Sequence, residues 1–162
     1  EFPHYQHVLN LSRINGPYIE VDRKKFVQKM KSFCDIVKDS YVRTTLEFLD
    51  GKLFIAVNGE DEQSMETELP ATPKEIDAEE PCISAVNGRY LLQALKSLRE
   101  EKVRLSIESG VRPIYLMEET EAERRYNLPM PLRVTDLKSR RPKLESESIE
   151  QQEPAEELQA AA

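Results

Sequence analysis

The sequence is poor in cysteine, in histidine and in long apolar runs. Of its 162 residues only two are cysteines, Cys34 and Cys82, which is too few for a disulfide scaffold or a four-thiolate metal site. We interpret both as thiols in or near the core. No stretch approaches the roughly 18 consecutive apolar residues that a membrane-spanning helix needs. These absences favour a cytoplasmic protein.

A set of residues suited to catalysis is also missing. His4 and His7, the two histidines of the chain, have a spacing that suits metal ligands, but no third ligand accompanies them, and we interpret them as residues of a surface strand or linker. The sequence contains no glycine-rich phosphate loop and no Gly-x-Ser-x-Gly motif. Glu118 and Glu119 form a pair of carboxylates that we expect to be solvated in a polar connector. The sequence therefore predicts no enzyme activity, no metal and no cofactor.

Acidic residues outnumber basic ones, 30 to 23, which gives a formal net charge of −7. Part of the excess lies in residues 135–162, which hold seven acids, four bases and no aromatic residue. Such a composition buries too little apolar surface to offset the entropy lost on ordering, and it predicts a disordered acidic tail. The chain begins Glu1-Phe2-Pro3, without an initiator methionine or the pattern of a signal peptide, which suggests a fragment or a processed chain.

An internal repeat organises the rest of the chain. The segment Val21–Phe33 recurs as Val86–Leu98, 65 residues later. Each copy begins with a residue suited to cap a helix, Asp22 or Asn87, and apolar residues follow at the spacing of one buried helical face. Taken alone, this similarity is also what any two capped amphipathic helices would show.

The segments around each helix favour a true duplication. One short extended stretch precedes each helix and three follow it, with Asp50-Gly51 suited to a tight hairpin turn and Pro70–Pro81 connecting the halves. The fold class predicted is α+β, a duplicated βαβββ unit with two helices on one face of a mostly antiparallel sheet. The predicted strands are residues 18–21, 44–49, 53–57 and 64–69 in the first half, and 82–85, 103–107, 111–117 and 126–134 in the second.

Although the chain is acidic, both predicted helices are basic. Residues 22–38 hold six bases and two acids, and residues 87–102 hold four bases and two acids. A repeated stripe of basic and amide side chains suits a polyanion that is held by its backbone without base readout. The alternative for either helix is an ordinary solvated face. The stripes are Lys24, Gln28 and Lys31 in one helix, and Arg89, Gln93 and Lys96 in the other.

Four segments then match a known family in order: Phe2–Tyr5, Val21–Phe26, Asn87–Leu95 and Met130–Arg133. Together they resemble the third, C-terminal domain of the bacterial DNA sliding clamp, the beta subunit of DNA polymerase III. The resemblance implies a processivity factor in which two three-domain subunits form a homodimeric ring. The ring would encircle duplex DNA whatever the DNA sequence. It also implies a clamp domain at 17–134, with halves 17–69 and 82–134, after a linker or the end of a preceding domain at 1–16. The DNA-facing residues implied are Arg23, Lys24, Lys31, Arg89 and Lys96.

The same resemblance implies a groove that binds short linear motifs of polymerases, the clamp loader and repair proteins. It further implies a subunit interface at Ile36. Met130, Pro131 and Leu132 could equally serve ordinary packing. The groove residues implied are Pro3, His7, Val8, Tyr41, Asn87, Tyr90, Val111, Pro113, Leu128, Met130, Pro131, Leu132 and Arg133.

Three departures from the family remain. His7 stands where arginine is usual and His4 where aspartate is common, the chain continues for 28 residues past Val134, and two preceding domains are absent. An alternative function is therefore a stand-alone, clamp-derived module that binds peptides and does not encircle DNA. For the extension we consider a tail that folds back to compete with partner peptides, and a merely solubilising tail.

Overall fold

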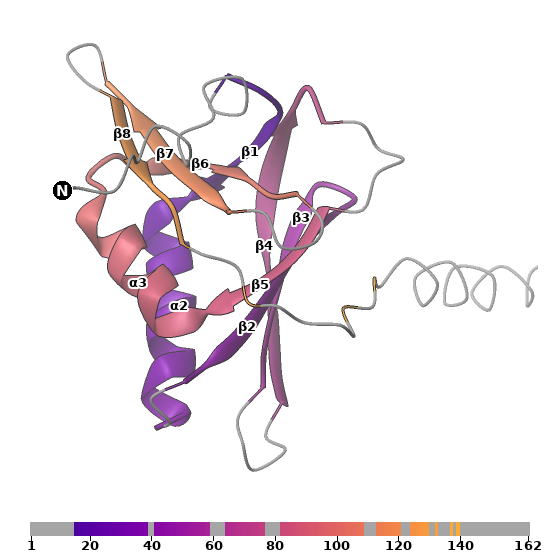
Figure 1. The fold of residues 1–162 in the computed structure, drawn as a ribbon, viewed down its shortest axis with the longest axis vertical. Helices are drawn as coiled ribbons and strands as arrows, with labels where there is room; N and C mark the ends of the chain where they lie inside the picture. Colours follow the sequence, from indigo (N-terminus) through magenta and orange to yellow (C-terminus); the bar gives the residue numbers. More distant parts are fainter. Residues whose placement is uncertain are drawn as a thin grey trace, which may run out of the picture.

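The computed structural model describes residues 15–38, 41–58, 64–76, 82–108, 113–120 and 124–129, together with Leu132, Leu137 and Ser139. Two helices and eight strands lie in this part of the chain (Figure 1). In chain order they are β1 (Tyr18–Asp22), α2 (Arg23–Ile36), β2 (Arg43–Leu49), β3 (Lys52–Asn58), β4 (Ser64–Lys74), β5 (Cys82–Asn87), α3 (Gly88–Ser97), β6 (Lys102–Ser106), β7 (Tyr115–Glu119) and β8 (Arg124–Asn127).

The strands form one antiparallel sheet in the order β5-β2-β3-β4-β1-β6-β7-β8. The first strand of each half pairs with a strand of the other half: β1 pairs with β6 of the second half, and β5 pairs with β2 of the first. The sheet curls around the two helices, which lie side by side on one of its faces (Figure 1). The predicted fold class is therefore confirmed, and the exchange of strands ties the two halves into one domain.

The core lies between the helices and the sheet. Phe26, Met30 and Phe33 of α2 are buried, as are Leu91 and Leu95 of α3, so the predicted apolar faces are confirmed. Cys34 is buried beside them and Cys82 is half-buried, so both are thiols in or near the core, as expected. Burial raises the pKa of the Cys34 thiol.

Local signals in the sequence place the helix starts and the first hairpin. The Asp22 carboxylate accepts a hydrogen bond from the Lys25 amide at 2.9 Å, and the Asn87 side chain accepts one from the Arg89 amide at 3.1 Å. Both residues are therefore the predicted N-caps. Asp50 and Gly51 both have positive φ, 50° and 73°, as a two-residue hairpin turn of this kind requires.

Three predicted boundaries are wrong. Residues 70–74, placed in the connector, continue β4, because Ala71–Lys74 pair with β1 after the strand has left β3. The strand predicted at 111–117 begins only at Tyr115, although residues 111 and 112 lie outside the described part. The strand predicted at 126–134 starts at Arg124 and stops before Leu128, since Pro129 has no amide hydrogen for the ladder.

Candidate nucleic-acid and peptide interfaces

Three of the predicted DNA-facing residues are exposed lysines on the two helices. Lys24 and Lys31 lie on α2, and Lys96 lies in the last turn of α3. Because the apolar faces of both helices turn toward the sheet, these ammonium groups lie on the opposite, open side of the helical layer. Among the described residues, Lys24 makes a long, exposed ion pair, 3.9 Å from Glu101. Exposed pairs of this kind contribute little, so the Lys24 ammonium group remains available to a polyanion.

Arg23 has a different environment from the lysines. Its guanidinium donates to the carbonyl oxygens of Glu100 at 2.5 Å and of Arg99 at 3.2 Å, and its amide donates to the Glu101 carbonyl at 2.8 Å. These carbonyls belong to the turn after α3, where the chain leaves the helix. The first residue of α2 therefore fixes the end of α3, where a cation is favourable.

Arg89 makes the reciprocal contact. Its guanidinium donates to the carbonyl oxygen of Val37, directly after α2, at 3.0 Å. The amide of Gly88, the first residue of α3, donates to the Val42 carbonyl at 2.7 Å. Each helix thus begins by binding the end of the other. Arg23 and Arg89 have a structural role that the charge pattern did not reveal.

Glu118 is a carboxylate whose environment we predicted wrongly. Instead of lying solvated in a connector, it is buried in β7, and its Oε2 accepts from the amides of Arg99 at 2.6 Å and Glu100 at 2.9 Å. The turn after α3 is therefore held by its amides as well as by its carbonyls. The signal that could have revealed this is alternation along β7, since an acid two residues from a core leucine faces the core.

Three predicted groove residues, Tyr41, Asn87 and Tyr90, lie near the start of α3. Asn87 and Arg43 are partners in the β2–β5 register, and the bond from Gly88 to Val42 brings the end of the α2–β2 connection beside them. Tyr90 is 65% exposed and Tyr41 is 43% exposed, an unusual exposure for large rings. The side-chain oxygen of Asn87 caps α3, which leaves its amide nitrogen as a donor.

The other described groove residues lie around the end of β8. The Ile114 amide donates to the Pro129 carbonyl at 3.3 Å, which brings Pro113 next to Leu128, and both are half-buried. The Leu132 amide donates to the Ala85 carbonyl at 2.7 Å. Leu132 therefore lies beside β5, and its partner Ala85 is two positions before Asn87 in that strand. Ile36, the predicted interface residue, ends α2 and is 56% exposed. Outside the described residues lie Pro3, His4, His7, Val8, Val111, Met130, Pro131 and Arg133.

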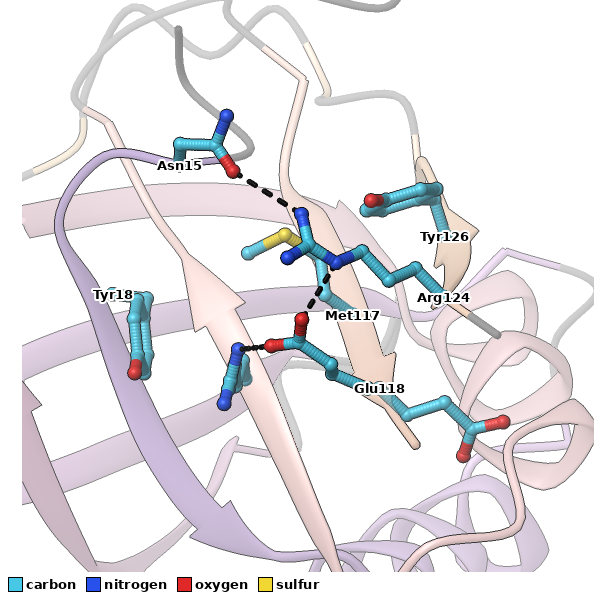
Figure 2. Close-up of a pocket in the computed structure, with 8 residues that line it drawn as sticks. Asn15, Tyr18, Met117, Glu118, Arg124 and Tyr126 are labelled. Carbon is cyan, nitrogen blue, oxygen red and sulfur yellow. Dashed lines mark hydrogen bonds and ion pairs between the residues drawn. The ribbon is translucent and has the colours of Figure 1, made fainter. Parts of the chain in front are cut away.

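A polar pocket of about 170 Å³ lies on the sheet face away from the helices, and no pattern in the sequence predicted it. Glu119 is paired there with Arg104 and with Arg124, whose Nε is 2.6 Å from the carboxylate, while Glu118 points away from the pocket (Figure 2). The hydrogen bond from Arg104, together with Arg124, lowers the pKa of Glu119. Arg104 also lies over the ring of Tyr18, 5.0 Å from its centre.

This pocket is an ion-pair cluster without the features of an acid–base site. A carboxylate whose pKa is lowered by two guanidinium groups stays ionised and is a poor proton donor or base at neutral pH. Within the described residues, no group of three or more histidine, cysteine, aspartate or glutamate side chains could hold a metal ion. Neither helix of this part of the chain is long and apolar enough to cross a membrane.

Several solved structures of bacterial sliding clamps share this fold. The DnaN sliding clamp from Bartonella birtlesii LL-WM9 is 30% identical with a TM-score of 0.69, covering 83% of this chain and 36% of that one. The DNA polymerase III subunit beta from Pseudomonas aeruginosa is 22% identical with a TM-score of 0.70, covering 83% and 35%. The polymerase III beta from Caulobacter crescentus is 20% identical with a TM-score of 0.70, covering 83% and 34%. None of the curated proteins matches the chain.

The duplicated fold and its helical layer define a sliding-clamp domain. The family described as DNA polymerase III beta subunit, C-terminal domain, matches residues 15–133. The chain belongs to this family, which is non-catalytic and whose members act with DNA and a polymerase. The predicted resemblance and the expectation of a non-enzyme are confirmed. The chain spans about a third of the length of the matching clamps.

Proposed function

We propose that this domain forms part of a processivity factor, contributing its helical layer to a ring around duplex DNA. The observation that carries the proposal is the exposure of Lys24, Lys31 and Lys96 on the side of the two helices away from the sheet. Arg23 and Arg89 hold the helices in place, so the lysines are presented on a fixed surface. Diffuse contacts of ammonium groups with phosphates permit sliding because no base is read.

Charge reversal on the helices tests this proposal. Lys31→Glu with Lys96→Glu should weaken binding of the chain to duplex DNA and flatten its dependence on salt by about two units of slope, one for each lost phosphate contact. Lys74→Glu, on the exposed end of β4, adds a negative charge away from the helices and serves as the control. Fluorescence anisotropy at several salt concentrations measures both. An equal loss with the control would mean that net charge, rather than the helical layer, governs binding.

We further propose that the surface around Tyr41, Asn87, Tyr90 and Leu132 docks short linear motifs of polymerases, the clamp loader and repair proteins. Exposed rings beside a donor amide suit a peptide that carries apolar anchors. Ile36 is proposed to lie in the subunit interface of the ring, because an exposed aliphatic side chain at a helix end is suited to burial by a neighbour.

An NMR titration of the chain with a Gln-Leu-x-Leu-Phe peptide tests the docking surface. Amide shifts should cluster at Asn87, Tyr90 and Leu132, and a peptide with alanine in place of leucine and phenylalanine should produce none. Peptide shifts without any DNA binding at low salt would favour the alternative, a peptide-binding module that does not encircle DNA. A folded chain without shifts would contradict the docking proposal.

A further inference from the structure

The turn that follows α3 is fixed from two sides. Its amides bind the buried carboxylate of Glu118, whose Oε2 accepts from Arg99 at 2.6 Å and from Glu100 at 2.9 Å. Its carbonyl oxygens bind Arg23, whose guanidinium and amide contact three successive residues of the turn, ending with Glu101. Main-chain groups held by distant partners on both sides leave the turn little freedom. The side chains that it carries therefore project from a defined position.

This turn lies at one end of the helical layer, together with two of the lysines proposed to face DNA. Because each helix begins beside the end of the other, α2 and α3 run in opposite directions. Lys24 in the first turn of α2 and Lys96 in the last turn of α3 therefore lie at the same end of the layer as this turn. Lys31 lies about two helical turns further along α2.

An acidic side chain interrupts the basic surface at this end. The Glu101 side chain is 88% exposed, and its Oε1 lies 3.9 Å from Nζ of Lys24, whose side chain is 73% exposed. An ion pair this long and exposed adds little to the stability of the fold. Its carboxylate nevertheless stays beside any phosphate that Lys24 binds, because the fixed turn holds it there. Like charges at such short range oppose binding even in water.

We propose that Glu101 limits the affinity of the helical layer for duplex DNA, an effect that rests on the proposed function of the layer. The carboxylate partly neutralises Lys24 and repels the phosphate groups that approach it. At a salt concentration of 0.1 M charges are screened over about 10 Å, so the repulsion acts mainly at Lys24 and is weaker at Lys31. A weakened hold on phosphates suits a domain that moves along DNA.

Neutralising the carboxylate tests this role. Glu101→Gln should raise the affinity of the chain for duplex DNA at low salt by about three- to tenfold, since an opposing charge next to Lys24 is removed. The dependence on salt should steepen by about one unit of slope, as expected for one additional phosphate contact. Glu68→Gln is the matched control, because it removes the acid of the exposed Lys52–Glu68 pair on the outward face of the sheet, and it should change little. Fluorescence anisotropy at several salt concentrations measures both variants.

Two further variants separate an effect of charge from an effect of structure. Glu101→Asp keeps the charge and should bind DNA like the unmodified chain. In a Lys24→Met background, Glu101→Gln should raise the affinity less than it does in the unmodified chain, because the cation that it would release is absent. A gain in Glu101→Asp as large as in Glu101→Gln would show that the shape of the side chain matters and would overturn the role of its charge.

The remaining outcomes distinguish this role from the proposed function. Equal gains in Glu101→Gln and Glu68→Gln would overturn the role of Glu101, since net charge alone would explain them. An unchanged or lower affinity in Glu101→Gln would overturn it as well. In each of these cases the variant with Lys31→Glu and Lys96→Glu still decides the proposed function. If the unmodified chain does not bind duplex DNA even at low salt, both proposals are wrong.

Discussion

The two halves of the domain share the βαβββ arrangement and the contacts at the helix starts, but their elements differ in length. Both helices start with a side-chain cap, and each half supplies an arginine that binds the main chain after the opposite helix. The lengths differ: α2 has 14 residues against 10 in α3, and β4 has 11 against four in β8. The long β4 extends far enough to pair with β1 of its own half, whereas in the second half, after the short β8, the Leu132 amide contacts β5.

The halves also differ at the first residue of each helix. In the first half this residue is Arg23, a position with room for a side chain, and in the second half it is Gly88. A Cβ atom at Gly88 would clash with Thr44 Oγ1 and would lie 3.1 Å from the Met30 methyl group. The second helix therefore starts in tighter contact with β2 and α2. The comparison shows that duplication preserved the relation between the halves while side-chain packing diverged.

The largest effect is expected from a substitution that gives the first residue of α3 a side chain, as the first residue of α2 has. Gly88→Ala forces the Cβ atom against Thr44 and should lower the free energy of unfolding by about 2 kcal/mol, because the core there cannot expand freely. Urea denaturation followed by circular dichroism measures the loss. Thr44→Ala should suppress much of it, so the double variant should lose less than the sum of the two singles. Gln93→Ala, exposed on α3, should be close to neutral, and additive behaviour at residues 44 and 88 would contradict the packing argument.

A smaller effect is expected from breaking the reciprocal contacts. Arg23→Met removes the guanidinium from the carbonyls after α3 and should cost about 1 kcal/mol, since these bonds are partly exposed to water. Lys24→Met removes the same charge from the next residue, whose ion pair is long and exposed, and should cost a few tenths of that. Amide exchange at Arg99 and Glu100 should accelerate only in the Arg23 variant. Equal costs for the two variants would show that charge, and not capping, is responsible.

The smallest effect concerns cross-strand ion pairs on the outer face. The second half carries Glu119 between two arginines, and the first half carries the pair of Lys52 and Glu68, 2.7 Å apart. Because the pKa of Glu119 is lowered in the folded state, its contribution is present above the ordinary glutamate pKa of about 4.3 and is lost as pH falls through the folded value. Glu119→Gln should therefore flatten the acid limb of stability against pH below about 5.

Denaturant titrations between pH 3 and pH 7 check this dependence, with Glu68→Gln as the control from the first half. The Glu119 variant and the unmodified chain should converge at the acid end, since the carboxyl is then neutral in both. A difference that persists unchanged down to pH 3 would show that Glu119 acts through packing instead of charge.

Much of the fold was predictable because its signals are local. Helix caps, helical periodicity and the Asp50-Gly51 turn each depend on residues within about four positions, and all are confirmed. The path of β4 through two prolines was not predictable, because pairing with β1 outweighs the turn signal of Pro70 and Pro73. At the candidate site, the sequence placed the exposed lysines and tyrosines. It did not distinguish Arg23 and Arg89 from the lysines, because their partners lie 77 and 52 residues away.

By itself, then, the sequence determined the duplication, the capped amphipathic helices, the hairpin and the family, since these depend on residue spacing along the chain. Only the tertiary structure decided the exchange of β1 and β5 between the halves, the capping role of the arginines, and the burial of Glu118. Those features depend on pairs separated by at least 18 residues. The free energy of such contacts comes from desolvation and hydrogen bonding in the assembled fold, and no local pattern records it.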